Sequence, residues 1–385
     1  MSIAILGFGN IGGETYKLIK QNSQLVSKAL KFSGADGDGS VVSYIMTRNQ
    51  IDKNIISGTK WTDSLDEILQ DPSVKLVAES IGGTDLAFEY CKKIITSGRH
   101  LISANKDLIA SRALELASLA EKHNVKFLFE ASCCGGIPII KILKDRARFA
   151  KINSFCGIVN GTSNYILSQM YHGGLDFNQA LKQAQNLGYA EANPKSDVEG
   201  YDAAYKATIM SSICLGQLVS FASVSFKGIL DITQADINYA KSINAKIKLV
   251  AIMQNFDHGK PLVCVLPCMV QSTNKLYFVD DAINGVDFDA GEQGRFFFSG
   301  PGAGGKQTAA SMFNDIMDAL LDSSQNHFGF SVSNSTEPAS NAIQNLSADA
   351  AFEAIICTNN SYTEEADFKP LHNDLHNTKF FIKLK

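Results

Sequence analysis

The sequence feature that most constrains the fold lies at the start of the chain, in "SIAILGFGNIGG" (residues 2–13). Glycines 7, 9 and 12 follow a strand-like apolar run directly and fit the pattern G-x-G-x-x-G. In this pattern the first glycine allows a tight turn, the second lets the backbone approach a pyrophosphate, and the third lets the next helix pack on the strand. A lone match is weak, but its place at the start of an alternating array predicts a dinucleotide site rather than a plain turn.

Short apolar runs alternate with helical segments through the first third of the chain. The runs lie at residues 2–6, 41–46, 75–80, 100–105 and 125–131. Strands separated by helices indicate a parallel sheet covered on both faces. The sequence therefore predicts an α/β fold with an N-terminal Rossmann nucleotide-binding domain over residues 1–131, to which a helix at 306–322 returns. Gly135, Gly136 and Pro138 break the alternation and predict a domain boundary.

The middle of the chain has a different pattern. A strand turns through Asn160 and Gly161 into a helix that Thr162 or Ser163 is expected to cap, and further helices follow at 177–188 and 201–216. Extended apolar runs come next, at 246–254, 261–270 and 295–300. This predicts a second, α+β catalytic and dimerisation domain over residues 132–305, built on a largely antiparallel or mixed sheet. Residues 331–385 lose periodicity and are expected to be a peripheral tail of unknown role.

Composition excludes several classes of protein. Lys and Arg total 35 against 39 Asp and Glu, and no basic block is present, so we expect no nucleic-acid partner. No run of about 18 apolar residues occurs and the N-terminus goes directly into a strand, so we expect no membrane partner and a cytoplasmic location. The eight cysteines form no C-x-x-C pair, and reduced thiols are a better interpretation than a zinc site.

One charged pair and two single charged residues each allow two interpretations. Asp202 and Lys206 lie one helical turn apart, as in a surface ion pair or an acid/base centre; the small and apolar neighbours favour a partly buried pair. Arg48 ends the second strand, where an arginine favours NADP over NAD unless it is only solvated. Lys106 opens a helix, where the helix dipole disfavours a cation, so a ligand's negative charge explains it better than a surface position does.

The cofactor is expected at the carboxyl ends of the parallel strands, where the βα turns meet. The predicted cofactor-binding residues are Gly7, Phe8, Gly9, Asn10, Ile11, Gly12, Arg48, Gly82, Gly83, Thr84, Asn105 and Lys106.

Several long motifs in this order resemble the homoserine dehydrogenase family. They are "GFGNIGG", "ESIGGT", "SANK", "EASCCGGIPII", "GIVNGTSNYIL", "LGYAEANPKSDVEGYDAAYKA" and "GPGAGG", over roughly residues 2–320. The resemblance implies reversible hydride transfer between L-homoserine with NAD(P) and L-aspartate 4-semialdehyde with NAD(P)H, a step toward threonine, methionine and isoleucine. It also implies a homodimer.

The resemblance carries specific roles to residues of this chain. Lys206 matches the proton donor, with Asp202 as its catalytic neighbour, and Lys106 matches a lysine that touches cofactor and substrate. Glu191 and Asp197 match the site of the substrate ammonium. Gly302 matches a late cofactor contact, and Glu130, Cys133, Gly135 and Ile137 match a site for a monovalent cation, usually sodium, held largely by backbone carbonyls. Apart from the resemblance, the backbone amides of the turn with Asn160, Gly161 and Thr162 are expected to hold the substrate carboxylate.

The chain departs from the family pattern at several positions. Cys134 stands where glycine or alanine is usual, and Asn193 replaces a frequent aspartate. No ACT-type regulatory module is recognisable in residues 331–385. Two alternatives therefore remain beside a homoserine dehydrogenase: a reductase of another amino-acid semialdehyde, and a non-catalytic nucleotide-binding regulator.

Overall fold

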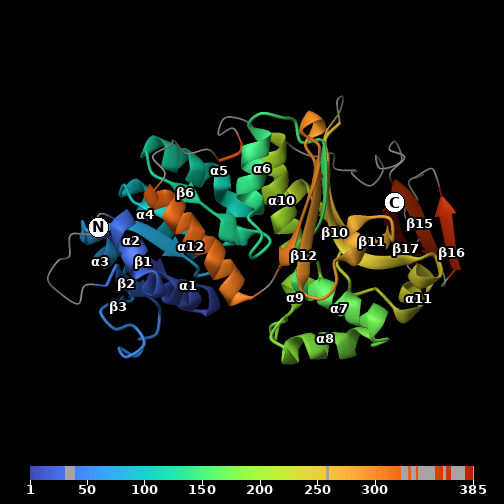
Figure 1. Ribbon diagram of the computed structural model, residues 1–385, viewed down its shortest axis with the longest axis horizontal. Coiled ribbons are helices and arrows are strands. Elements are labelled where there is room, and N and C mark those ends of the chain that lie inside the picture. The colour runs from blue at the N-terminus through green and yellow to red at the C-terminus, as the bar shows by residue number, and fades with distance from the viewer. Residues whose placement is uncertain are drawn as a thin grey trace. The chain divides into compact units, whose positions relative to one another are not determined.

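The protein is described by a computed structural model (Figure 1). It describes residues 1–30, 40–256, 260–302, 304–321, 328–330, 335–336, 352–358, 361–365 and 378–384. The chain forms two compact units, one of Met1–Lys144 with Gly304–Ser333 and one of Asp145–Ala303 with Asn334–Lys385. Among the described residues, no helix is both long enough and apolar enough to cross a membrane.

The first unit is built on a parallel sheet with the strand order of dinucleotide-binding folds. Its described strands are β1 (Ser2–Leu6), β2 (Val42–Met46), β3 (Lys60–Thr62), β4 (Val74–Glu79), β5 (His100–Ser103) and β6 (Phe127–Leu128). They follow the order β3-β2-β1-β4-β5-β6 and all pair in parallel. The order reverses between β1 and β4, the position at which such sheets bind ligands. The predicted Rossmann fold is confirmed; the short edge strand β3 was not predicted.

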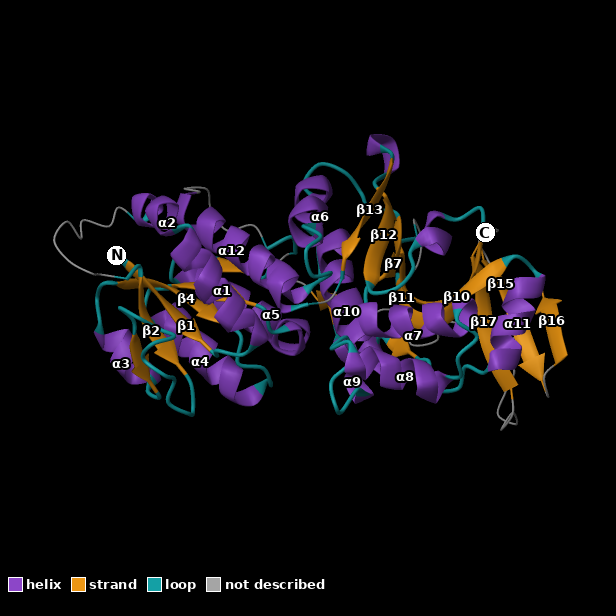
Figure 2. Cartoon of the chain, turned by 60° about the horizontal axis from the view of Figure 1, so that its bottom comes forward, coloured by secondary structure: helices purple, strands orange, loops and turns teal. Residues whose placement is uncertain are grey.

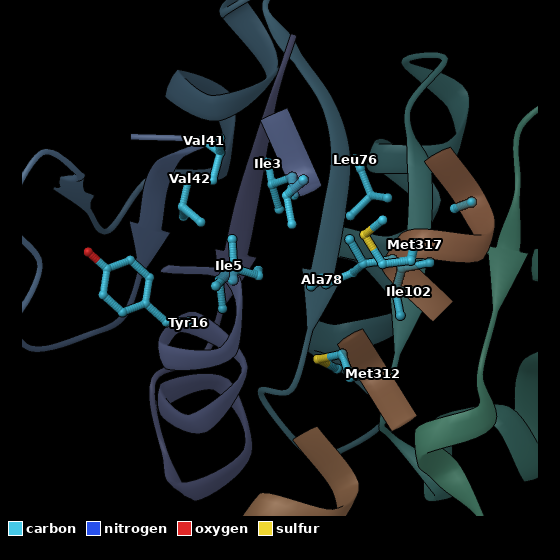
Figure 3. Packing of buried hydrophobic residues seen from close by; sticks show 14 of the residues in the cluster. Ile3, Ile5, Tyr16, Val41, Val42, Leu76, Ala78, Ile102, Met312 and Met317 are labelled. Atoms are coloured by element: carbon cyan, nitrogen blue, oxygen red, sulfur yellow. The ribbon is translucent and has the colours of Figure 1, made fainter. Parts of the chain in front are cut away.

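Helices surround this sheet and complete its core. They are α1 (Asn10–Gln21), α2 (Ser23–Ala29), α3 (Leu65–Gln70), α4 (Asp85–Thr96), α5 (Lys106–Lys122), α6 (Ile139–Ala147) and α12 (Gly305–Leu321). The late helix α12 packs beside α1 (Figure 2), where the Thr15 hydroxyl donates to the Met312 sulfur at 3.4 Å. Met312 and Met317 join Ile3, Ile5 and Ile102 of the strands in one buried cluster (Figure 3).

The chain leaves the first unit within α6, beyond the change of domain expected between residues 131 and 132. Two contacts explain why this segment stays with the first unit. The Glu130 carboxylate accepts backbone N–H groups of Ile140 and Lys141 at 2.8 and 2.7 Å, and the Ser311 hydroxyl of α12 donates to the Gly135 carbonyl at 2.6 Å. The predicted glycine break is therefore a turn inside the unit.

The second unit is built on a mixed sheet, as predicted. Its main described strands are β7 (Ser154–Ile158), β10 (Ala245–Gln254), β11 (Leu262–Gln271), β12 (Ile283–Asp289) and β13 (Arg295–Pro301), joined by β15 (Phe352–Thr358), β16 (Ser361–Glu365) and β17 (Thr378–Leu384). The order is β13-β12-β7-β10-β11-β17-β15-β16, with β11 and β17 parallel and the pairs of β10 antiparallel. Described strands of the predicted peripheral tail thus extend the sheet.

Three helices of the described second unit pack on this sheet: α7 (Gly161–His172), α10 (Tyr201–Leu215) and α11 (Gln234–Ser242). Two more, α8 (Phe177–Asn186) and α9 (Lys195–Val198), pack on these helices. Helix α10 is buried on nearly all sides and contacts β10 and β11, which explains its small and apolar sequence. It ends at Gly216, whose φ of 65° confirms the predicted C-cap. The cap of α7 was predicted wrongly: Asn160, not Thr162 or Ser163, accepts the Ser163 N–H at 2.7 Å.

Candidate active site

The glycine turn after β1 has the geometry its motif predicts. Gly7 has a φ of 87°, in the left-handed region that favours glycine. A side chain at Gly12 would meet the Gly7 carbonyl oxygen at 2.1 Å, so only glycine lets α1 approach the strand this closely. A side chain at Gly9, in contrast, would meet no atom within 4 Å. The turn at Gly9 therefore leaves the N-terminus of α1 open to a ligand, as anion binding requires.

A pocket of about 1010 Å³ lies against this turn and belongs entirely to the first unit. Its wall includes predicted cofactor residues from three different turns: Gly7, Phe8, Gly9, Arg48, Gly82, Gly83 and Thr84. It also includes polar residues that were not predicted, among them Asn49, Gln50, Asp63, Ser80 and Tyr90. Asn49 and Gln50 follow Arg48 directly in the sequence. The length of the turn after the second strand was therefore the sequence signal that could have identified them. The pocket's size is suited to a dinucleotide or one half of it.

Arg48 is held on the pocket wall by the turn that contains it. The Thr47 hydroxyl donates to the Asn49 carbonyl at 2.6 Å and accepts the Trp61 indole N–H at 3.0 Å. These bonds fix the backbone on both sides of Arg48 while its side chain remains exposed. The arrangement places a guanidinium at the end of β2, where the ribose end of a dinucleotide is read in this fold.

Asn105 and Lys106 lie at the start of α5, as predicted. The Asn105 side chain caps the helix by accepting the Leu108 N–H at 3.1 Å and donates to the Gly83 carbonyl at 2.7 Å. Asn105 thus joins two predicted cofactor turns through its side chain. Lys106 is the first residue of the helix and its side chain is 34% exposed. Asn10, Ile11 and Gly12 open α1 in the same unit.

Asp202 and Lys206 form a buried ion pair in the second unit. The Lys206 ammonium donates to Asp202 Oδ2 at 2.7 Å and to the Val159 carbonyl at 2.8 Å. Lys206 is only 8% exposed and Asp202 only 5%. The surface-pair interpretation is therefore excluded. Burying two charges costs desolvation energy that their attraction only partly returns, so stability alone is a weak reason for the pair. Asp202 lies in the first turn of α10, where the helix dipole favours an anion.

Asn160 connects this pair to helix α9, which precedes α10 in the sequence. Its amide donates to Asp202 Oδ2 at 2.8 Å and to Asp197 Oδ1 at 2.7 Å. Its carbonyl oxygen caps α7, so the whole side chain is used and lies 4% exposed. The structure thus brings together Asn160, Asp197, Asp202 and Lys206, and gives the Asn160 side chain a bridging position that the sequence did not predict.

The remaining predicted substrate residues lie around the same helix N-terminus. Gly161 and Thr162 are the first residues of α7, and the Thr162 hydroxyl donates to the Tyr189 carbonyl at 2.7 Å. That bond ties α7 to the loop carrying Glu191, whose own carbonyl accepts from the Gln185 side chain at 3.2 Å. Glu191 is exposed, unlike Asp202.

A buried amide that the sequence did not reveal also contacts the acceptor of Lys206. Asn284 of β12 is fully buried and donates to the Val159 carbonyl at 3.2 Å. A side chain at Gly302 would lie 2.0 Å from the Asn284 amide, so Gly302 packs its bare Cα against it. Gly302, predicted as a cofactor contact, lies in the second unit. It packs against Asn284, which donates to the same Val159 carbonyl that accepts from Lys206.

The predicted cation residues lie together in the turn before α6. Glu130, Cys133, Gly135 and Ile137 are all in the first unit, and the carbonyls of Glu130, Gly135 and Ile137 each already accept one hydrogen bond. Each carbonyl retains a second lone pair, and such hard oxygens suit an alkali cation. Burial raises the pKa of the Glu130 carboxyl to about 7, and burial with the nearby Glu130 raises that of Asp315. Among the described residues no group of three acidic, cysteine or histidine side chains forms a metal site.

Cys134 has a φ of 55°, a conformation that non-glycine residues rarely adopt. The departure from the family pattern at this position therefore puts a cysteine into left-handed backbone, within the turn that carries the predicted cation ligands. Its side chain is fully buried. Cys91, Cys156, Cys214, Cys264 and Cys268 are free thiols, and burial raises the pKa of each.

Two family models match the chain. The model of the homoserine dehydrogenase NAD binding domain matches residues 7–130, and the model of homoserine dehydrogenase matches residues 138–317. Homoserine dehydrogenase of Pseudomonas aeruginosa is 35% identical over 320 residues, which are 83% of this chain and 72% of that protein. Homoserine dehydrogenase of Neisseria gonorrhoeae is 36% identical over 318 residues, with the same two coverages.

Solved structures of the same kind of enzyme are similar throughout both units. A homoserine dehydrogenase from Thiobacillus denitrificans has a TM-score of 0.82 and 30% identity, covering 93% of this chain and 82% of its own. A hyperthermophilic archaeal homoserine dehydrogenase in complex with NADPH has a TM-score of 0.66 and 26% identity, covering 84% of this chain and 98% of its own.

Proposed function

Because the chain belongs to the homoserine dehydrogenase family, NAD(P)-dependent oxidoreductases that act on a CH–OH group, we propose that it interconverts L-homoserine and L-aspartate 4-semialdehyde, with Lys206 as the acid and base. The observation that carries the assignment of Lys206 is its buried pair with Asp202 beside the Val159 carbonyl. When bound, a nicotinamide cofactor would supply the hydride for reduction and accept it in oxidation.

Lys206 handles the proton of the reacting oxygen. Reduction of the aldehyde puts negative charge on this oxygen, and a positioned ammonium stabilises it and donates a proton. Among the described residues, two acceptors take two of the three donors of the Lys206 ammonium, and the third is directed to substrate. Asp202 holds the ammonium in place, while Asn160 holds Asp202. In oxidation the neutral amine accepts the hydroxyl proton.

The loop before α10 holds the amino-acid end of the substrate. Glu191 and Asp197 supply carboxylates for the ammonium, and the backbone N–H groups of Gly161 and Thr162 at the start of α7 bind the carboxylate. Glu191→Gln removes one charge from an exposed position and is expected to raise the KM for homoserine about tenfold while the KM for NADP stays within about twofold. Steady-state kinetics with each substrate varied in turn measures both, and an effect confined to NADP would contradict the role.

The proposed cofactor is NADP, whose 2'-phosphate Arg48 would hold. Arg48 on the wall of the cofactor pocket supports this preference, as a guanidinium binds phosphate with two parallel hydrogen bonds. The contacts of the glycine turn, of Gly82, Gly83 and Thr84, and of Lys106 complete the proposed site, and Gly302 stays a separate prediction. Arg48→Ala is expected to lower kcat/KM for NADP at least about tenfold more than for NAD. An unchanged NADP/NAD ratio would remove Arg48 from this role.

A sodium ion bound by carbonyls of Glu130, Cys133, Gly135 and Ile137 would hold the turn before α6. The oxygen-rich donors and the buried carboxylates of Glu130 and Asp315 support this part of the proposal. The homodimer, the cytoplasmic location and the place in threonine, methionine and isoleucine biosynthesis remain predictions.

One assay tests the function as a whole. Steady-state rates are measured with L-homoserine and with other ω-hydroxy amino acids, with NAD and NADP, and with sodium, potassium or neither. We expect oxidation of homoserine with NADP to have the highest kcat/KM. Oxidation of another hydroxy amino acid alone would favour a different semialdehyde reductase, and binding of NADPH without any turnover would favour a non-catalytic regulator.

A further inference from the structure

Glu79 is a fully buried carboxylate to which no role in the reaction has been assigned. It is the last residue of β4, beside the point where the strand order reverses, and its exposure is 0%. Burial raises the pKa of its carboxyl, while hydrogen bonds from Ser103 and the Ile81 amide oppose the rise. An isolated buried acid is costly, so both of its oxygens need partners.

Its partners form a closed ring of hydrogen bonds. The Ile81 N–H donates to Glu79 Oε1 at 2.8 Å, and the Ser103 hydroxyl donates to Glu79 Oε2 at 2.5 Å. The Ser103 oxygen accepts the Asn105 N–H at 3.1 Å, and the Asn105 amide donates to the Gly83 carbonyl at 2.7 Å. Gly83 leads back to Ile81 through the turn itself.

The ring passes through both turns that follow the central strands. Residues 80–84 form part of the wall of the cofactor pocket, and Gly82 and Gly83 there have φ of 69° and 73°. Two successive left-handed glycines give a backbone with little intrinsic preference for one conformation. The other side of the ring ends at Asn105, which caps α5 and directly precedes Lys106. Fixing the ring therefore fixes residues 80–84 of the pocket wall and the backbone from which the Lys106 side chain extends.

A carboxylate suits this position better than any neutral side chain of its size. Two groups donate to it, one N–H and one O–H, and a carboxylate offers two acceptor oxygens where an amide offers one. We propose that Glu79 is a positioning residue for hydride transfer, which holds the 80–84 turn and the Ser103–Asn105 segment in the geometry that the nicotinamide cofactor and Lys106 require. This inference rests on the proposed function of the pocket and of Lys106.

The test compares Glu79→Gln with Glu89→Gln in the full-length protein. Glu89 lies on α4 of the same unit, its side chain is 56% exposed, and it forms an ion pair with Lys92. NADPH binding is measured by fluorescence titration, alongside kcat and the KM of each substrate. We expect Glu79→Gln to raise the Kd of NADPH about tenfold and to lower kcat, with the KM of homoserine within about threefold of wild type, and Glu89→Gln to change none of them.

A double mutant separates positioning from a merely structural role. Because Ser103→Ala breaks the same ring, the Kd changes of Glu79→Gln and Ser103→Ala should be less than additive in the double variant. A lower Tm with an unchanged Kd for NADPH, or fully additive effects, would overturn the proposal. If Glu79→Gln does not fold, Ser103→Ala alone carries the test by its Kd. Absence of homoserine oxidation in wild type would overturn the proposed function but leave the binding comparison interpretable.

Discussion

At the scale of single residues, the spacing of Asp202 and Lys206 left a surface pair and an acid/base centre both open. What decides between them is burial, which the small and apolar neighbours only favoured and which results from the packing of α10 with β10 and β11. The same applies to Asn160 and Asn284. Their amides meet Asp197, Asp202 and the Val159 carbonyl only after distant segments fold together.

The hydrogen bonds from Asn160 to Asp197 and Asp202 can be removed while its side chain still caps α7. Asn160→Asp retains an oxygen for the Ser163 N–H but loses the donor to Asp197 and Asp202 and adds a third negative charge beside them. We expect kcat/KM for homoserine to fall at least about tenfold, because the aspartates repel and Lys206 loses its fixed partner. Steady-state kinetics measures this, with the exposed Asn238→Asp on α11 as control. Equal effects of both substitutions would contradict the bridge.

Gly302 should tolerate no side chain. Gly302→Ala places a methyl group where the Asn284 amide lies, 2.0 Å away, and is expected to lower kcat by displacing Asn284 from the Val159 carbonyl. In the double variant Gly302→Ala, Asn284→Ala the clash is gone, so its loss should be smaller than the sum of the two single losses. Additive losses would show that the two residues act independently.

At the scale of elements, the sequence predicted the strands that are apolar and flanked by turns, and it missed those that are short or mixed. β12 (Ile283–Asp289) was missed because Asn284, Gly285 and Asp287 interrupt its apolar pattern. A glycine is needed there, since a side chain at Gly285 would meet Val279 at 2.7 Å. The tail strands β15, β16 and β17 pair with one another, and β17 also pairs with β11, so their order depends on long-range pairing rather than on local propensity.

β10 was predicted as an apolar strand, yet it carries two buried lysines. Lys246 and Lys248 lie on one face and donate to Asp280 at 2.6 and 2.9 Å. Burial lowers the pKa of Lys248 to about 8. Although burial alone would raise the pKa of Asp280, the two lysines lower it to about 2, below its usual 3.8. Because folding lowers the pKa of this carboxyl, the ionised Asp280 stabilises the folded state at pH values above about 4. This stabilisation is lost as the pH falls from about 4 to 2.

Asp280→Asn should remove both the charge partner and this acid dependence. We expect a loss of about 2–3 kcal/mol in the free energy of unfolding near pH 7, because two buried lysines lose their counter-charge, and a shallower decline between pH 4 and 2. Urea unfolding across this range measures both. Asp231→Asn, which breaks an exposed pair with Lys227, is the control and should change little. Identical acid profiles for wild type and Asp280→Asn would contradict the account.

At the scale of the whole molecule, the proposed roles divide between the two units. The pocket beside the glycine turn is lined by the first unit alone, whereas Asp202, Lys206 and the segment with Glu191 and Asp197 belong to the second. The motifs predicted this division, because the glycine turn and the lysine helix lie in separate patterns of the sequence. The exact change from one unit to the other, within α6, depends on Glu130 capping that helix and could not be read from the glycine break.

The central claim is that Lys206 moves the proton while the other unit holds the cofactor. The most direct test is Lys206→Met, which keeps the shape of the side chain and removes its charge, with the exposed Lys182→Met of α8 as control. Homoserine oxidation and NADPH titration are measured on both. We predict that kcat of Lys206→Met falls at least about 100-fold, the scale of general acid catalysis, while the Kd for NADPH stays within about threefold of wild type. A kcat within tenfold of wild type would contradict the claim.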